Sequence, residues 1–185
     1  MPQITDHETA AQHLRAARRV AVFGTSGAGK STFSMRLADR LGLRYVSLDR
    51  DMRWLPGWRV RDRDAQRRLH DEFAASENWV IDGTSVSLMD TRLARADVAV
   101  WMRLPRHVAL WGVYARVIRR YGQVRPEMAE GCPEQLPDRE FLSYIWNFER
   151  RQSPRIDDAL TRHGSGVPLV VLRSRREATA LLDGL

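Results

Sequence analysis

The chain has very little cysteine, very little lysine and no long apolar run. Cys132 is the only cysteine among 185 residues, which excludes an internal disulfide and a cysteine-rich zinc site. No apolar run approaches the ~18 residues of a membrane span, and the polar, acidic N-terminus does not resemble a secretion signal. We therefore expect a single cytoplasmic domain over residues 1–185, without contact to a membrane.

The shortage of lysine is informative in itself. Of the 30 basic residues only Lys30 is a lysine, which leaves 29 arginines. Genome composition can produce such a bias, but a retained ammonium group can act as a compact point charge where a planar guanidinium cannot. The formal net charge of +7 favours polyanionic ligands such as nucleotides, phosphorylated sugars or nucleic acid.

Five short apolar segments alternate with helical patterns along the chain. These segments are residues 19–24, 45–49, 79–82, 98–104 and 169–172. Helical patterns lie between them, among others at residues 62–76, 89–95, 106–121 and 141–152. Such alternation is typical of an α/β fold, in which helices cover both faces of a parallel sheet. The stretch 122–137 is rich in proline and glycine, and we expect a small helical lid, mobile over about residues 116–140.

Residues 24–31, Gly-Thr-Ser-Gly-Ala-Gly-Lys-Ser, match the pattern G-x-x-x-x-G-K-[ST] between a predicted strand and a predicted helix. In this setting the backbone N–H groups converge on phosphate oxygens at the positive end of the helix. We expect Lys30 to reach the β- and γ-phosphates and the Ser31 hydroxyl to bind Mg²⁺. The residues that we assign to the ATP site are Gly24, Ser26, Gly27, Ala28, Gly29, Lys30, Ser31, Thr32 and Arg173.

Two absences narrow the class of nucleotide-binding protein. Guanine-specific GTPases read their base with an Asn-Lys-x-Asp element, which requires a second lysine. Motor-type ATPases usually end their second acidic strand in Asp-Glu, whereas Gly83 follows Asp82 in this chain. No glutamate is therefore placed to activate water, and transfer of the phosphoryl group to an acceptor is favoured over hydrolysis. The sequence predicts a kinase.

Two aspartates, Asp49 and Asp82, end predicted strands at the edge where open α/β sheets bind their ligands. With the strand order of small P-loop kinases, Asp82 holds a water of the Mg²⁺ shell together with Ser31. Asp49 then orients or deprotonates an acceptor hydroxyl, and Asp51 shares the acceptor site. The alternative for each aspartate is a carboxylate that caps the following helix.

Arginines crowd the region before the irregular stretch, with six of them and no acidic residue within 103–125. Arg116 and Arg120 share one helix face, and we expect them to neutralise charge on the transferred phosphoryl group. Arg151 and Arg155 are assigned to the acceptor site. The alternative is a solvated basic face or a patch that binds nucleic acid.

Two tryptophans, Trp54 and Trp58, bracket Leu-Pro-Gly shortly after Asp49. They can stack on a planar acceptor such as a base, or they can pin their loop to the core. Both tryptophans are assigned to the acceptor site.

The order of these motifs resembles that of the adenylate-kinase-like P-loop kinases. The phosphate loop, Leu48-Asp49, the Trp-Leu-Pro-Gly-Trp segment and Trp-Val-Ile-Asp-Gly at 79–83 carry the resemblance, which extends over about residues 19–182. More narrowly, the chain looks like the bacterial branch labelled DNA topology modulation protein, FlaR-type. The resemblance implies a P-loop NTPase three-layer α/β/α sandwich and a five-stranded parallel sheet in the order 2-3-1-4-5. It also implies ATP with Mg²⁺ and an acceptor site between Asp49 and Asp82.

The chain departs from true adenylate kinases after the third strand, where Thr84-Ser85-Val86 replaces Phe-Pro-Arg. Asp49-Arg50-Asp51 is nearer to the pattern of hydroxyl-phosphorylating kinases such as shikimate or uridine kinases. We expect an ATP-dependent phosphotransferase that acts on a nucleotide, a nucleoside or another small molecule, as a monomer or a dimer. The alternative is an ATP-binding regulatory or DNA-associated protein, although no segment resembles a DNA-binding motif.

Overall fold

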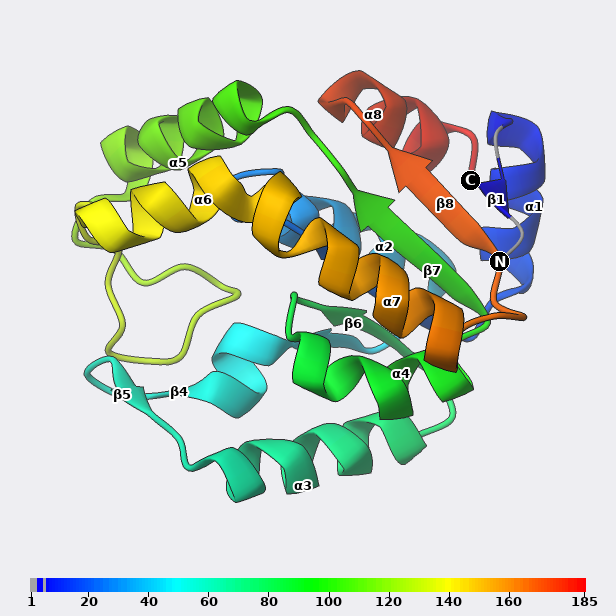
Figure 1. Cartoon of the computed structure of the whole chain (residues 1–185), viewed down its shortest axis with the longest axis horizontal. Helices are drawn as coiled ribbons and strands as arrows, with labels where there is room; N and C mark the ends of the chain where they lie inside the picture. Colours follow the sequence, from blue (N-terminus) through cyan, green and yellow to red (C-terminus); the bar gives the residue numbers. More distant parts are fainter. Residues whose placement is uncertain (1–2, 5) are drawn as a thin grey trace.

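The structure is a computed structural model that describes residues 3–4 and 6–185 (Figure 1). The described residues form a central six-stranded parallel sheet in the order β1-β8-β7-β2-β6-β3. Its strands are β1 (Gln3–Ile4), β2 (Arg19–Gly24), β3 (Tyr45–Ser47), β6 (Trp79–Asp82), β7 (Val98–Met102) and β8 (Leu169–Leu172). The five predicted strands are present in the predicted order, and β1 adds a short strand beside β8 that the sequence did not predict.

The central strands are apolar along their whole length because both faces of the sheet are covered. Every residue of β6 and β7 is buried, and so are the five residues of β2 after Arg19. A strand buried on two faces has no solvent side, so its sequence reads as a continuous apolar run rather than an alternation. Trp79 and Trp101 fill the sheet with the largest fully buried side chains.

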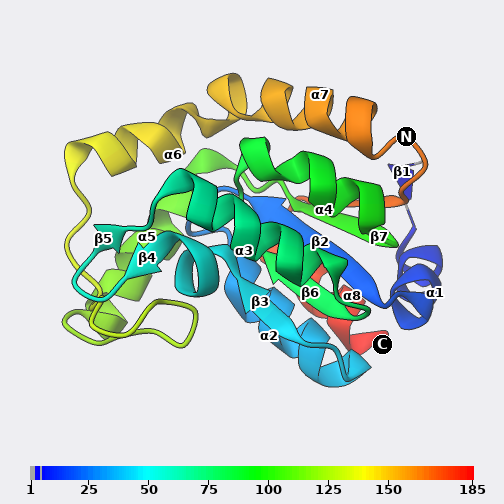
Figure 2. The ribbon, with the colours of Figure 1, turned by 90° about the horizontal axis from the view of Figure 1, so that it is seen from below.

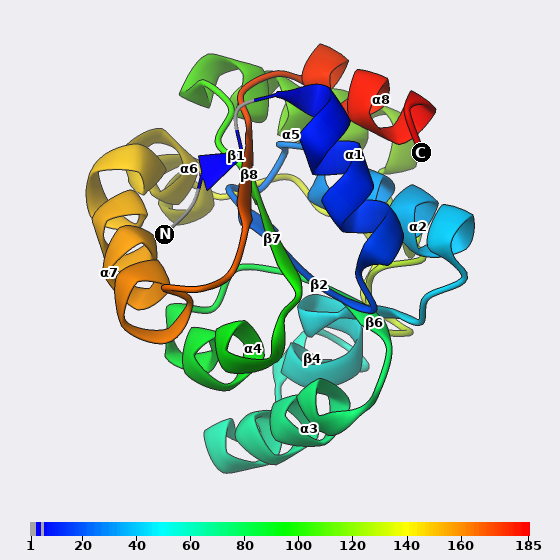
Figure 3. The ribbon, with the colours of Figure 1, turned by 90° about the vertical axis from the view of Figure 1, so that its right-hand side faces the viewer.

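Helices form a layer on each face of the sheet (Figures 2 and 3). One layer consists of α1 (His7–Ala16), α2 (Lys30–Leu41) and α8 (Arg175–Asp183). The other layer consists of α3 (Arg63–Ala75), α4 (Met89–Arg95) and α7 (Ser153–His163). The remaining two long helices, α5 (Arg106–Arg120) and α6 (Arg139–Arg151), pack on each other beside the ends of the strands (Figure 1). This arrangement is the expected three-layer α/β/α sandwich.

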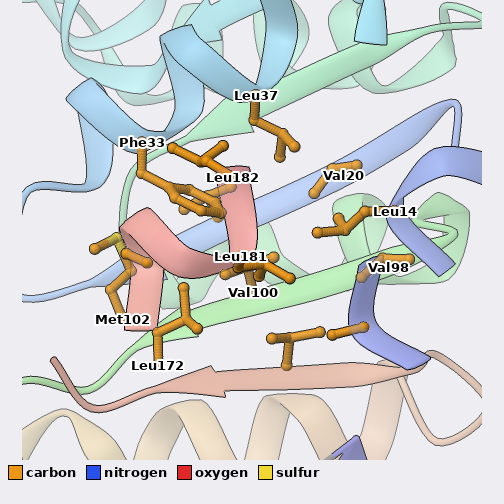
Figure 4. Close-up of a cluster of buried hydrophobic side chains, with 14 of the residues drawn as sticks. Leu14, Val20, Phe33, Leu37, Val98, Val100, Met102, Leu172, Leu181 and Leu182 are labelled. Carbon is orange, nitrogen blue, oxygen red and sulfur yellow. The ribbon is translucent and has the colours of Figure 1, made fainter. Parts of the chain in front are cut away.

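Leucines hold the first helical layer against the sheet. Leu14, Leu37 and Leu181 come from three different helices and lie against Val20 and Val100 of the sheet (Figure 4). These five side chains are at most 1% exposed. Burying a side chain of this size stabilises the fold by roughly 1.5–3 kcal/mol, so this layer contributes strongly to stability.

The chain around Pro154 is more helical than the sequence suggested. As expected, α6 ends before Pro154, at Arg151, but α7 begins at Ser153 and was not predicted. A proline is tolerated in the first turn of a helix, because the N–H group that it lacks has no helical partner there. Within the described ranges, no helix is both long and apolar enough to cross a bilayer.

The expected lid is helical only at its two ends. Between α5 and α6, residues 121–138 are irregular and are held by the isolated bridges Tyr121↔Glu134 and Val124↔Pro133. Prolines at 126, 133 and 137 account for this, because proline lacks the N–H group that a helix interior needs. The segment lies beside the hairpin of β4 (Trp54–Leu55) and β5 (Arg59–Val60) (Figure 1).

Candidate active site

The phosphate loop follows β2 and leads directly into α2. Gly24, Gly27 and Gly29 have φ angles of 145°, 80° and 95°, which favour glycine. A Cβ atom on Gly27 would lie 2.0 Å from the carbonyl oxygen of Ala109 in α5, so this glycine also permits a close approach. No side chain among the described residues caps the start of α2. The N–H groups there therefore remain available to an anion.

Lys30 reaches back over this loop. Its Nζ atom donates a hydrogen bond of 3.0 Å to the carbonyl oxygen of Thr25. Burial lowers the pKa of Lys30, while the charges of Asp82 and Asp49 raise it. The ammonium group is thus held at the phosphate loop under the influence of two carboxylates, and its expected contact with the β- and γ-phosphates stays a prediction.

Asp82 ends β6 next to the phosphate loop and is only 3% exposed. The hydroxyl of Tyr45 donates a hydrogen bond of 3.2 Å to its Oδ2 atom, whereas Oδ1 is buried without a hydrogen-bond partner among the described residues. Burial raises the pKa of Asp82, and the charge of Lys30 and the hydroxyl of Ser31 lower it. A buried oxygen of this kind needs a donor or a cation to compensate its lost hydration.

The surroundings of Asp82 fit Mg²⁺. Ser31 and Asp82 offer only oxygen atoms, which this cation prefers, and Mg²⁺ usually binds to one or two protein groups together with water and phosphate oxygens. In the described part of the chain no three His, Cys, Asp or Glu residues gather into a metal cluster. A site that relies on the nucleotide for most of its ligands is consistent with that finding.

Two hydrogen-bonding residues of this region were missed by the sequence analysis. Thr84 donates to the carbonyl oxygen of Gly24 at 2.7 Å and accepts from the N–H group of Gly24 at 2.8 Å. Tyr45 keeps its hydroxyl proton, because burial and the charge of Asp82 raise its pKa. Thr84 directly follows Asp82-Gly83, which is the one sequence signal that could have identified it.

Arg92, also missed, supports the same loop from α4. It is fully buried and its Nη1 atom donates a hydrogen bond of 2.9 Å to the carbonyl oxygen of Gly83. Burial lowers the pKa of Arg92 to about 10, partly offset by the charge of Asp82. The loop after β6 is therefore held to the phosphate loop by Thr84 and to α4 by Arg92.

Asp49 lies on the acceptor side, in a π-helical turn (Leu48–Arg53) that follows β3. It is exposed, and its charge raises the pKa of Lys30 and that of Tyr144 in α6. Asp51 is different, because its Oδ2 atom accepts from the N–H group of Ser47 at 2.8 Å and both of its oxygens bind Arg50. Both carboxylate oxygens of Asp51 therefore stabilise the turn by binding Ser47 and Arg50, rather than lying free for an acceptor.

Two arginines, one from α5 and one from the irregular segment, act electrostatically on Lys30. The charges of Arg116 and Arg125 both lower the pKa of Lys30. Arg116 was expected in the site, whereas Arg125 was not singled out. Arg120 is exposed, and its Nη1 atom lies 3.4 Å from Oε1 of Gln123. This last residue of α5 thus contacts its own chain beyond the helix end, and its expected role toward a phosphoryl group stays a prediction.

The other predicted arginines are not brought into the site. Arg151 and Arg155 are exposed. The Nη1 atom of Arg155 lies 3.5 Å from Oε1 of Gln152, three residues earlier in the chain. Arg173 is exposed and donates its backbone N–H to Glu177 at the start of α8. Arg175 reaches the phosphate loop instead, with a hydrogen bond of 3.0 Å from Nη2 to the carbonyl oxygen of Gly27.

The two tryptophans pin the hairpin rather than offer a free stacking surface. Trp54 and Trp58 meet edge to face with ring centroids 5.1 Å apart. Both pack against buried residues of the irregular segment, namely Met128, Ala129 and Cys132. This contact ties the hairpin to the irregular segment rather than to the central core, and the acceptor role of both rings stays a prediction.

Comparisons with known proteins agree with this geometry. A family model described as an AAA domain matches residues 20–111, just under half of the chain. Shikimate kinase of Persephonella marina is 31% identical over 74 residues, which are 35% of this chain and 45% of that protein. Shikimate kinase of Nitrobacter winogradskyi is 30% identical over 126 residues, which are 60% of this chain and 59% of that protein. The chain thus matches about half the length of these curated relatives.

Solved structures extend the likeness to nearly the whole chain. Shikimate kinase from Acinetobacter baumannii in complex with shikimate has a TM-score of 0.55 at 15% identity, covering 94% of this chain and 93% of that one. A gluconokinase from Sinorhizobium meliloti 1021 has a TM-score of 0.51 at 20% identity, covering 89% and 91%. Together with the phosphate loop and the strand order, these likenesses show that the chain has the α/β fold of the P-loop kinases.

Proposed function

We propose that the protein is an ATP-dependent phosphotransferase that moves the γ-phosphate of ATP to a small-molecule acceptor. The observation that carries this proposal is the buried carboxylate of Asp82 beside β2 and the phosphate loop, with an Oδ1 atom that has no hydrogen-bond partner among the described residues. The charge of Lys30 lowers the pKa of this carboxylate. The charge of Asp49 also acts on Lys30, whose pKa it raises. The names of the relatives, shikimate kinases and a gluconokinase, support a kinase that acts on a hydroxyl group.

Each residue then has a defined task. The N–H groups of the loop and Lys30 bind the phosphates, and Ser31 and Asp82 would hold Mg²⁺, which supplies charge neutralisation at the phosphate oxygens when bound. Asp49 accepts the proton of the acceptor hydroxyl. The hydroxyl oxygen bonds to the γ-phosphorus while the bond from this phosphorus to the bridging oxygen of ADP breaks. Arg116 and Arg125 stabilise the charge on the transferred group.

The acceptor side favours a hydroxyl compound over a nucleotide. Asp49 is the free carboxylate there, because Asp51 is bound by Ser47 and Arg50. The rings of Trp54 and Trp58 are engaged with the irregular segment, so we infer that neither of these two rings serves as a platform for a base. We therefore infer an acceptor that presents an alcohol to Asp49 and needs no aromatic stacking.

Two further parts of the proposal concern the whole chain. We infer a single kinase domain over residues 1–185, with a lid over about 116–140 that moves during the reaction. We also infer that the chain belongs to the FlaR-type branch, which the Trp-Leu-Pro-Gly-Trp segment supports.

A screen of ATP consumption with Mg²⁺ tests the proposal. Nucleosides, nucleoside monophosphates, sugar acids and hydroxylated cyclic acids are offered as acceptors, and ADP release is compared with a control without acceptor. We expect a hydroxyl compound to raise turnover, and Lys30→Met to lower it by about a hundredfold or more. Lys30→Arg, which keeps the charge but not its shape, should also lose activity. The proposal fails if no acceptor raises ADP release above the control.

The net charge of +7 favours one rival, an ATP-binding protein that associates with DNA through its arginines. Binding to DNA phosphates should weaken steeply with added salt. Nucleotide binding in the phosphate loop should instead depend on Mg²⁺. DNA binding that persists in Lys30→Met, combined with no acceptor-dependent turnover, would favour the rival.

A further inference from the structure

The irregular segment carries a buried carboxylate that joins two arginines. Glu134 is only 4% exposed. Its Oε1 atom accepts a hydrogen bond of 2.8 Å from Nε of Arg116, and its Oε2 atom lies 2.6 Å from Nε of Arg125. One carboxylate thus holds two guanidinium groups, one on each oxygen.

This arrangement leaves the outer nitrogens of both arginines available. The Nη atoms of Arg116 form no hydrogen bond with the described residues, and Arg125 commits only Nη1, to Glu127 at 2.6 Å. Glu134 meets both groups at their Nε atoms, with a hydrogen bond to Arg116 and an ion-pair contact to Arg125 that lacks hydrogen-bond geometry. The ends of the guanidinium groups therefore remain free for another anion. Helix α5, which carries Arg116, packs directly on the phosphate loop, since a Cβ atom on Gly27 would lie 2.9 Å from Cγ2 of Val113. The charges of both arginines also lower the pKa of Lys30 in that loop.

The two arginines need a shared anion in order to stay together. Burial lowers the pKa of Arg116, the charge of Arg125 lowers it further, and Glu134 raises it. Without Glu134, repulsion and the affinity of a guanidinium for water would both separate the pair.

Glu134 is itself fixed by the backbone. Its N–H group donates to the carbonyl oxygen of Gln123 at 2.9 Å, and its carbonyl oxygen accepts from the N–H group of Gly122 at 2.9 Å. The same segment is attached to the acceptor side, since the Ser47 hydroxyl donates to the carbonyl oxygen of Glu127 at 2.9 Å. The carboxylate therefore has a defined place relative to the site.

We propose that Glu134 is a positioning residue, which holds Arg116 and Arg125 ready to bind the γ-phosphate of ATP. The inference rests on the proposed function in so far as ATP is the ligand. Charged donors that are placed in advance need no reorganisation when the phosphate arrives. In the competing interpretation, the negative charge of Glu134 repels the γ-phosphate. Removal of this charge would then raise the affinity for ATP, whereas our proposal predicts that it lowers this affinity.

Titration calorimetry with Mg²⁺ tests this by comparing affinity for ATP with affinity for ADP, which lacks the γ-phosphate. Glu134→Asp keeps the charge but is one methylene too short to reach both arginines. We expect its ATP affinity to fall about tenfold, with ADP affinity unchanged. Glu134→Gln should show the same selective loss. Glu130→Asp and Glu130→Gln are the matched controls, because Glu130 lies exposed in the same segment without an ion pair to any described residue.

Three results of the calorimetry alone overturn the proposal. These are unchanged ATP affinity in Glu134→Asp, a rise of ATP affinity in Glu134→Gln, and equal affinity of the unaltered protein for ATP and ADP. A lower melting temperature with an intact preference for ATP shows a structural role, which also overturns it. If neither Glu134 variant folds, Arg116→Lys, which lacks the Nε donor, must show the selective loss of ATP affinity. These measurements report nucleotide affinity and need no acceptor, so they remain valid if the acceptor screen fails. The proposed phosphotransferase function and the proposed role of Glu134 can therefore fail separately.

Discussion

At the scale of single residues, Thr84 shows how a small polar side chain can hold the phosphate loop. Its hydroxyl satisfies both backbone groups of Gly24, a buried residue at the end of β2. A buried N–H group without a partner costs about 1–3 kcal/mol. The shape of the loop thus depends on a residue that is distant from it in the sequence.

Thr84→Val should therefore destabilise the protein by about 1–3 kcal/mol, because valine keeps the volume of threonine but not its hydroxyl. The free energy of unfolding from denaturant titration measures this. Thr161→Val is the control, since that hydroxyl lies on an exposed part of α7 and binds only Asp157 of the same helix. Equal stability of the two variants would show that the bonds to Gly24 do not matter.

The sequence predicts those site residues whose role is local. Lys30 and Ser31 belong to one contiguous motif, and Asp82 ends an apolar strand, so the fold brings them together once the strands are parallel. Glu134 and Arg125 could not be predicted in this way. Their role arises from contacts of an irregular segment, for which hydrophobic periodicity provides no signal.

At the scale of secondary-structure elements, the hairpin β4–β5 and the irregular segment 121–138 act as one unit. The N–H group of Gly57 donates to the carbonyl oxygen of Gly131 at 3.2 Å, and the N–H group of Trp58 donates to Sγ of Cys132 at 3.3 Å. Sγ of Cys132 in turn donates to the carbonyl oxygen of Leu55 at 3.4 Å. The aromatic rings of the hairpin complete this contact.

Trp58→Ala should release the irregular segment without unfolding the sheet, because the removed ring packs on residues of that segment rather than on the central core. Faster amide hydrogen exchange over residues 126–132 would reveal the release. Trp111→Ala removes a ring that is 62% exposed and serves as the control, with exchange expected to stay unchanged. Equal exchange in the two variants would contradict the unit described above.

The elements that the sequence missed share a physical cause. Strand β1 has two residues and gains its order from pairing with β8, so no pattern of its own identifies it. Helix α7 is defined by packing against α4 and by a proline that usually marks a helix end. The central strands were predictable because burial on both faces requires a continuous apolar run.

At the scale of the whole molecule, a polar group is buried within the second helical layer, on α3. His70 of α3 is fully buried, and only Nδ1 has a near partner among the described residues, Asp71 at 3.4 Å. Burial above all, with a contribution from the charge of Arg92, lowers the pKa of His70 to about 4. The folded protein therefore keeps this imidazole neutral at mildly acidic pH.

Acidification should consequently destabilise the protein through His70. The usual pKa of histidine is about 6.5, and that of His70 in the folded protein is about 4. At pH values between these two, His70 binds a proton in the unfolded chain but not in the folded protein. Stability should thus fall as the pH drops through this window, by about 2 kcal/mol between pH 7.5 and 5. His70→Leu should remove this part of the loss, measured as unfolding free energies at both pH values. The raised pKa of Asp82 also contributes to the pH dependence, but Asp82 is present in the unaltered protein and in the variant, so its contribution cancels in the comparison. An identical pH dependence of the two proteins would contradict the prediction.

The edge-to-face pair Trp54 and Trp58 gives the molecule an optical signal of its own. Two indoles at a centroid distance of 5.1 Å and an interplanar angle of 78° are placed for coupling of their electronic transitions. Because the irregular segment packs against both rings, any displacement of that segment changes their environment. Near-ultraviolet circular dichroism can therefore follow the opening of this end of the molecule in solution, without an attached dye.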